Sequence, residues 1–176
     1  DLYLDCTPRS DEALAASVAE LKELAPHVMV AYAAGAAALA RFVNDRGLRD
    51  WNDFPVLTGA ERLWPADREQ IEAAFGPAFE TYGCRETMMI SSECEAHDGM
   101  HVAMETMIVE LLVREEDGSI RDARPGELGE IAITGRFLAT GYWQRPDLPA
   151  ARFMPAADGQ RCYRSGDLGR IDANGE

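Results

Sequence analysis

The sequence predicts an α/β protein in which a helix-flanked, mostly parallel sheet is followed by a small antiparallel sheet or partial barrel. In the first half, short apolar runs alternate with helical patterns, as they do where parallel strands are joined by helices. After Met107 the helical period disappears, and short apolar runs alternate with glycine-containing turns. We therefore expect one domain over residues 1–100 and a second over residues 101–176.

The first half begins with a predicted helix that the side chain of Ser10 can cap and that ends before Pro26. Residues 28–31 are apolar enough for a buried strand. The alanine-rich stretch that follows is a predicted helix to about Asn44, and Gly47 can end it. The order helix, strand, helix fits the first part of a layered α/β domain.

The same alternation continues toward residue 82. Residues 54–58 repeat the strand pattern, and Pro65, which a helix accepts in its first turn, opens a further helix. Gly76-Pro77 ends that helix, and residues 78–82 form the next predicted strand. In such a sheet, functional groups gather at the carboxyl ends of the strands.

In the second half we expect strands at residues 107–113 and 130–134, with a turn at Asp117-Gly118 after the first of them. Near the end of the chain, Asn174-Gly175 is a strong hairpin signal with no return strand behind it. We therefore expect the sequence to be an internal piece of a longer enzyme, whose amino- and carboxy-terminal parts lie outside it.

The composition excludes some partners. Lys and Arg number 17 against 31 Asp and Glu, and the net charge of −14 disfavours nucleic acid and anionic membranes. The longest apolar run, residues 28–40, is too short to span a bilayer, and no secretory signal opens the chain. The cysteines lack the spacing of a disulfide framework, so we expect a cytoplasmic protein with reduced thiols at Cys6, Cys84, Cys94 and Cys162.

Three glycine-containing motifs follow one another along the chain: Thr81–Thr87 (TYGCRET), Gly126–Gly135 (GELGEIAITG) and Tyr163–Arg170 (YRSGDLGR). In this order they resemble the adenylate-forming superfamily, which comprises acyl- and aryl-CoA ligases, luciferases and the adenylation domains of peptide synthetases. The likeness covers residues 54–176 and includes the segment Gly141–Pro146, to which we assign no chemistry. It implies an AMP-binding ligase that converts an organic acid and ATP into an acyl-adenylate and pyrophosphate. A thiol, either of CoA or of carrier-protein phosphopantetheine, would then accept the acyl group.

The resemblance also implies roles for single residues. Tyr82 would stack on adenine, Glu86 would be the catalytic residue that serves Mg²⁺ and the triphosphate, and Asp167 would bind both ribose hydroxyls. These residue types suit the roles, because Mg²⁺ prefers oxygen ligands and an ionised carboxylate can accept from both hydroxyls of a diol. Gly83 would let the ligand approach the backbone closely. Arg85 departs from the family's Thr or Ser, although its donors can still hold a phosphate.

The turn Gly59-Ala60-Glu61 follows a predicted strand at the end where ligands bind in sheets of this kind. In the family this turn borders adenine and the acyl substrate, which makes all three residues candidates for lining that pocket. A plain strand-to-helix turn explains the same residues equally well.

Cys94, His97 and His101 form a second candidate site, because Cys and His are good zinc ligands. Their spacing matches no familiar zinc finger, and a polar loop with a buried cysteine is the competing interpretation. The surrounding stretch resembles the phenylacetate-CoA ligase branch, which favours an aryl acid as the substrate, whereas residues 163–176 look more like a peptide-synthetase adenylation domain.

Two parts that the reaction needs are not seen in the sequence. No Ser/Thr/Gly-rich phosphate loop with a lysine precedes Tyr82, and no carboxy-terminal lid with a catalytic lysine follows Asp167. The lysines of the loop and the lid carry positive charges that would stabilise the negatively charged transition state. Without them, we expect the isolated chain to be inactive. Two alternatives to an enzyme stay open: a non-catalytic nucleotide-binding or scaffold module of the same fold, and a small zinc-binding interaction domain.

Overall fold

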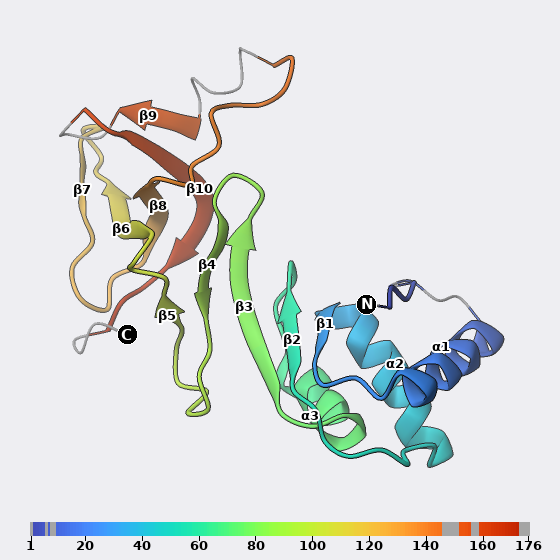
Figure 1. Ribbon diagram of the computed structural model, residues 1–176. Helices are drawn as coiled ribbons and strands as arrows, with labels where there is room; N and C mark the ends of the chain where they lie inside the picture. The colour runs from blue at the N-terminus through green and yellow to red at the C-terminus, as the bar shows by residue number, and fades with distance from the viewer. Residues whose placement is uncertain (1, 6, 8–9, 146–151, 156–158, 173–176) are drawn as a thin grey trace. The chain divides into compact units, whose positions relative to one another are not determined.

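The computed structural model describes residues 2–5, 7, 10–145, 152–155 and 159–172 (Figure 1). Cys6, Pro146 and the hairpin signal at Asn174-Gly175 lie outside the described residues. The chain divides into two compact units. The first takes residues 1–82 and 92–98, and the second takes residues 83–91 and 99–176. Segment 83–91 therefore belongs to the same unit as the second half of the chain. The domain expected from the sequence over residues 1–100 includes this segment in the first half instead.

The first unit alternates helices and strands as the sequence predicts. Its elements are α1 (Asp11–Leu24), β1 (Met29–Tyr32), α2 (Ala33–Arg46), β2 (Val56–Gly59), α3 (Pro65–Ala74) and β3 (Ala78–Cys84), whose last two residues belong to the second unit. β1 pairs with β2, and β2 with β3, in parallel register. No helix among the described residues has the length and apolar character needed to cross a membrane.

Three local signals set the helix ends. The Ser10 side chain accepts a hydrogen bond from the Ala13 NH and caps α1, Gly47 ends α2 with a φ of 61°, and Pro65 opens α3. These positions confirm the predicted helix boundaries. They work because each residue satisfies or removes a backbone group that a helix end leaves unpaired.

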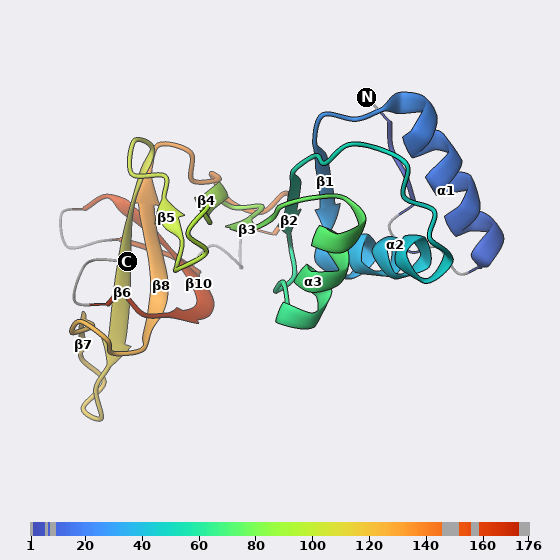
Figure 2. The ribbon, with the colours of Figure 1, turned by 90° about the horizontal axis from the view of Figure 1, so that it is seen from below.

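The core of the first unit lies where the alanine-rich α2 meets α3 and the strands β1 and β2 (Figure 2). Small side chains on α2 allow this close approach, and large side chains fill the remaining space. Among the side chains of this core that are fully buried, the largest apolar ones are Val43, Val56, Ile71 and Phe75. Burial of each such side chain contributes about 1.5–3 kcal/mol, so this packing sets the geometry of the strand ends.

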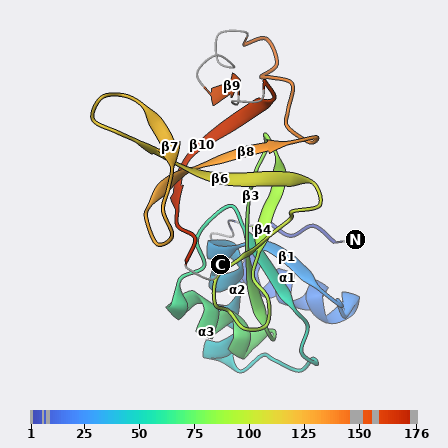
Figure 3. The same ribbon diagram turned by 90° about the vertical axis from the view of Figure 1, so that its left-hand side faces the viewer.

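The second unit is built from short strands. They are β4 (Met88–Ser92), whose last residue belongs to the first unit, β5 (His101–Val102), β6 (Met107–Arg114), β7 (Ile120–Asp122), β8 (Gly129–Gly135), β9 (Phe153–Pro155) and β10 (Arg161–Gly169). One sheet has the order β1-β2-β3-β4-β5, and the other has the order β7-β6-β8-β10-β9. Every pairing described for the second sheet is antiparallel, and Figure 3 shows β6, β8 and β10 side by side. The predicted fold class, a mostly parallel sheet followed by an antiparallel half-barrel, is confirmed.

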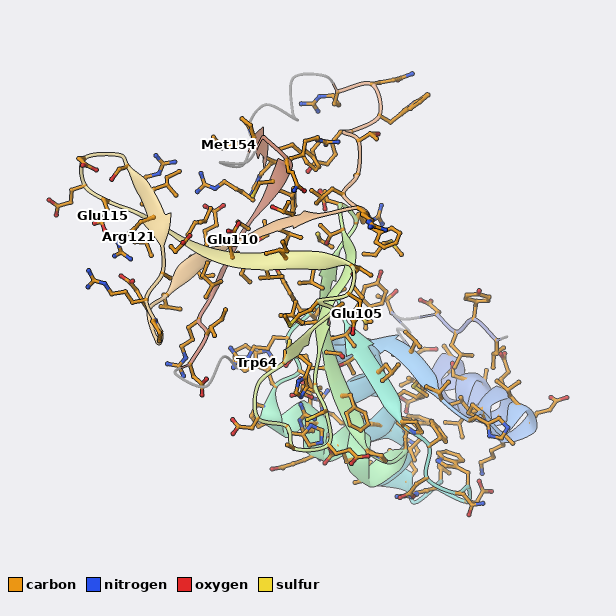
Figure 4. The ribbon with its side chains drawn as sticks, turned by 60° about the vertical axis from the view of Figure 1, so that its left-hand side comes forward. Trp64, Glu105, Glu110, Glu115, Arg121 and Met154 are labelled. Atoms are coloured by element: carbon orange, nitrogen blue, oxygen red, sulfur yellow. The ribbon has the colours of Figure 1, made fainter. Side chains whose placement is uncertain are left out.

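The middle motif, Gly126–Gly135, has a structural role. Arg121 on β7 pairs with Glu115 across the β6–β7 hairpin, where both are labelled in Figure 4, and with Glu127 at 2.8 Å. Hydrogen bonds from Arg121 and from the Arg124 NH lower the pKa of Glu127 to about 2. Glu127 of this motif therefore connects the segment before β8 to β7.

Candidate functional site

β10 departs from regular pairing within the motif that carries Asp167. Its ladder with β8 is regular up to Arg164 and resumes at Leu168, so a β-bulge covers the residues between them. Gly166 at the centre of the bulge has a φ of +83°, which favours glycine. Bulges re-aim side chains and recur beside functional sites. The exposed Asp167 side chain lies in this irregular segment.

Side chains of the motif and of Arg152 hold the bulge in place. The Ser165 hydroxyl donates to the Ile131 carbonyl at 3.0 Å and accepts from the Asp167 NH at 3.0 Å. The Arg152 guanidinium donates to the carbonyls of Ser165 at 2.9 Å and Arg164 at 3.3 Å. These contacts fix the backbone on both sides of Gly166. They thereby fix the backbone from which the Asp167 side chain extends.

Glu86 lies in the tight turn between β3 and β4, beside the exposed Arg85. A side chain at Gly83 would collide with the Met88 carbonyl of the adjacent strand. The structure thus gives a reason for glycine here that the sequence did not reveal: the backbones of β3 and β4 approach closely. The Cys84 thiol lies 3.1 Å from the Thr87 hydroxyl and closes the same turn.

Two hydrogen bonds from the segment 139–142 hold Glu86. The Tyr142 hydroxyl donates to Glu86 Oε1 at 2.6 Å, and the Ala139 NH donates to the Glu86 carbonyl at 2.7 Å. Burial by itself would raise the pKa of Glu86, but hydrogen bonds led by that of Tyr142 outweigh it and lower the pKa below its ordinary value. The same hydrogen bond raises the pKa of Tyr142. Glu86 is therefore a carboxylate and Tyr142 its donor at neutral pH.

Aromatic rings connect Tyr142 to β10. Its ring meets the edge of Phe153 with 5.8 Å between centroids, and Phe153 lies 5.1 Å from Tyr163. Tyr163 is buried, and burial is the main cause of its raised pKa. The structure thus places the Glu86 turn and the Tyr163–Arg170 motif in one unit, joined through Tyr142 and Phe153. Sequence reasoning gave Tyr142 no role, although its place in Gly141–Pro146 was the signal available.

The half-buried Tyr82 belongs to the first unit, whereas Asp167 belongs to the second. Tyr82 lies on β3 near the end of the strand, as predicted. That Tyr82 and Asp167 face a common nucleotide crevice stays a prediction.

The Gly59-Ala60-Glu61 turn follows β2 directly. An added Cβ at Gly59 would lie 2.9 Å from the Thr81 hydroxyl, and Ala60 adopts a left-handed φ of 64°. Glu61 Oε2 accepts a hydrogen bond from the Ala34 NH at 2.9 Å, at the start of α2. An acidic side chain stabilises a helix amino terminus, so Glu61 has a structural partner in addition to its predicted role at the substrate pocket.

The three predicted zinc ligands fall in different surroundings. His97 lies in the first unit, where its Nδ1 is 3.2 Å from Glu93 and 3.0 Å from Arg68. Cys94 is half-buried in the same loop, and His101 begins β5 in the second unit. Within the part of the chain that the structure describes, no group of three or more His, Cys, Asp or Glu side chains is arranged to hold a metal ion.

No protein-family model matches the chain. Among curated proteins it is 33% identical over 135 residues to a dimodular nonribosomal peptide synthase of Bacillus subtilis, covering 74% of this chain and 5% of the relative. It is 32% identical over 131 residues to enterobactin synthase component F of Escherichia coli, covering 72% of this chain and 9% of that protein. Novobiocin biosynthesis protein H of Streptomyces niveus is 49% identical over 63 residues, which are 34% of this chain and 10% of that protein. The chain thus spans a tenth or less of the length of these relatives.

Solved structures share the fold. A long-chain-fatty-acid-CoA ligase from Archaeoglobus fulgidus matches with a TM-score of 0.72 and 21% identity, covering 92% of this chain and 35% of that one. A four-domain nonribosomal peptide synthetase bound to AMP and glycine matches with a TM-score of 0.69 and 27% identity, covering 90% and 12%. An anthranilate CoA ligase in complex with anthranoyl-AMP matches with a TM-score of 0.73 and 18% identity, covering 96% and 32%.

The chain has the fold of acid-activating ligases, which these solved structures share, and the order of its three motifs agrees with that class. The sequence relatives, which include peptide synthetases, agree with this class. The chain belongs to the adenylate-forming superfamily, which the motifs of the sequence resemble.

Proposed function

We propose that the protein carrying this chain activates an organic acid with ATP, forming an acyl-adenylate and pyrophosphate, and then transfers the acyl group to the thiol of CoA or of a carrier protein. The observation that carries the proposal is the second unit, in which Glu86 is held as a carboxylate and a bulge positions Asp167. Peptide synthetases and CoA ligases among the relatives support the same chemistry. A cytoplasmic location fits the use of ATP.

The proposed nucleotide contacts follow the motifs. Tyr82 stacks on adenine, and Gly59, Ala60, Glu61 and Gly83 border the nucleotide and acid. Asp167 accepts from the ribose hydroxyls, because its carboxylate can serve two donors. Arg85 contacts a phosphate through its planar set of donors, and its exposed position supports this role.

The Glu86 carboxylate is a suitable ligand for Mg²⁺. The ion is usually held by one or two carboxylates together with substrate phosphates, and Glu86 is a carboxylate with a lowered pKa. When bound, Mg²⁺ neutralises charge on the triphosphate. Zinc at Cys94, His97 and His101 is not included, because these side chains form no group arranged to hold a metal ion among the described residues.

The test is acid-dependent exchange of pyrophosphate into ATP by the whole protein, with aryl acids, other small organic acids and amino acids as candidate substrates. Asp167→Ala removes a charged hydrogen-bond acceptor, so we expect AMP affinity to fall about 10- to 100-fold. Asp122→Ala, at an exposed position on β7, is the matched control and should leave AMP binding unchanged. AMP binding without exchange for any acid would favour the non-catalytic scaffold instead.

A further inference from the structure

We infer that Tyr142 is a positioning residue: its hydroxyl orients the Glu86 carboxylate toward a metal-bound nucleotide. The inference rests on the proposed function, since it concerns the residue that would serve Mg²⁺. It adds a residue outside the motifs to which the sequence assigned chemistry. Both side chains belong to the second unit, and both are described by the structure.

The contact between the two residues has the geometry of a strong hydrogen bond. The phenol oxygen lies 2.6 Å from Glu86 Oε1, in the range of a hydroxyl bound to a carboxylate. The Ala139 NH holds the backbone carbonyl of the same glutamate at 2.7 Å. One short segment therefore fixes both the backbone and the carboxylate of Glu86, although the chain separates Tyr142 from it by 56 positions.

The segment that carries Tyr142 is itself held. The Arg161 guanidinium donates to the Ala139 carbonyl at 2.7 Å and lies over the Phe153 ring, 4.8 Å from its centroid. Phe153 in turn packs between the rings of Tyr142 and Tyr163. The hydroxyl of Tyr142 is thus presented from a framework anchored on β9 and β10, as a precise site requires.

Fixing one carboxylate oxygen sets the direction of the other. In metal sites, partners that hold the ligands from behind are worth about 10- to 100-fold in metal affinity or activity. A tyrosine that only packed on Phe153 would contribute through its ring, which phenylalanine also supplies. Removal of the hydroxyl alone therefore separates positioning from packing.

The experiment uses Tyr142→Phe in the whole protein, with Mn²⁺ in place of Mg²⁺ so that metal binding in the presence of ATP can be followed by electron paramagnetic resonance. We expect the affinity for Mn²⁺ with ATP to fall about tenfold. Metal-free AMP binding should stay at the wild-type value. The matched control is Tyr3→Phe, the same chemical change at a side chain that is 91% exposed in the first unit.

A double-mutant cycle with Glu86→Gln identifies the route of the effect. If Tyr142 acts through Glu86, Tyr142→Phe should cause no further loss of Mn²⁺ affinity in the Glu86→Gln background. An equal loss in both backgrounds, or wild-type affinity in Tyr142→Phe, overturns the inference and leaves the proposed function standing. A wild-type protein that binds no Mn²⁺ with ATP refutes the proposed function, and the inference with it.

Discussion

Arg68 and Glu93 form a two-oxygen ion pair, with Arg68 Nη2 at 2.8 and 2.7 Å from the two carboxylate oxygens. Arg68 comes from α3, and Glu93 follows β4 and also accepts from the Glu80 NH of β3 at 2.7 Å. The two side chains are 19% and 10% exposed. The pair therefore links α3 to β3, the strand that carries Tyr82.

Replacing Arg68 by methionine should destabilise the first unit. The substitution keeps much of the buried stem but leaves Glu93 without its charge partner, which costs about 3 kcal/mol for a pair of this burial. The helices α1, α2 and α3 all belong to the first unit, so urea unfolding followed by circular dichroism reports its free energy of unfolding. As a control, Lys22→Met breaks the exposed pair with Asp50 and should cost less than about 1 kcal/mol. Equal losses in the two variants would contradict the prediction.

The stability of the first unit should fall as the solution is acidified. Burial alone would raise the pKa of Glu93, but hydrogen bonds from Arg68 and the Glu80 NH, the contact with His97 and the charge of Arg68 lower it. A folded-state pKa below the unfolded value stabilises the protein above the unfolded value, and this contribution is lost as pH falls through the folded value. Between about pH 5 and pH 3, wild type should therefore lose more stability than Glu93→Gln. Parallel curves for the two proteins would refute this origin.

The helix ends were predictable from the sequence because Ser10, Gly47 and Pro65 act on backbone groups within a few residues of themselves. β4 was not predicted, because its short apolar run is followed by two serines and lacks a clear period. β10 was not predicted either, because its bulge at Gly166 interrupts the alternation of apolar and polar residues that identifies a strand.

The candidate site was predictable only in part for a related reason. Glu86 and Asp167 were predicted as site residues because each lies in a recognisable motif, and their roles stay predictions. Tyr142 was not given a role, since its contact with Glu86 spans 56 positions and leaves no local pattern. Arg68 and Glu93, 25 positions apart, were missed in the same way.

The cysteines should differ in their reaction with iodoacetamide. Cys162 is 5% exposed, and burial raises the pKa of its thiol, so little of the reactive thiolate forms. Cys84 and Cys94 are half-buried free thiols. Mass spectrometry of alkylated peptides should show slower labelling at Cys162 than at either of them, and urea should remove the difference. Labelling of native Cys162 at the rate of Cys94 would contradict the buried position.

Gly166→Ala should weaken both stability and nucleotide binding. The residue has a φ of +83°, and an added Cβ would collide with the end of the Arg152 side chain. Gly118→Ala is the matched control, because Gly118 has a φ of +86° but nothing within 4 Å of the added Cβ. Backbone strain alone should cost each variant about 1–2 kcal/mol in the free energy of unfolding.

Only the Gly166→Ala variant should also displace Arg152 from the Ser165 carbonyl, which adds about 1 kcal/mol for the lost hydrogen bond. Because that contact holds the bulge that positions Asp167, AMP affinity measured by calorimetry should fall in Gly166→Ala and stay unchanged in Gly118→Ala. If both variants bind AMP as wild type does, the bulge is a feature of the sheet alone, and Asp167 does not depend on it to reach the nucleotide.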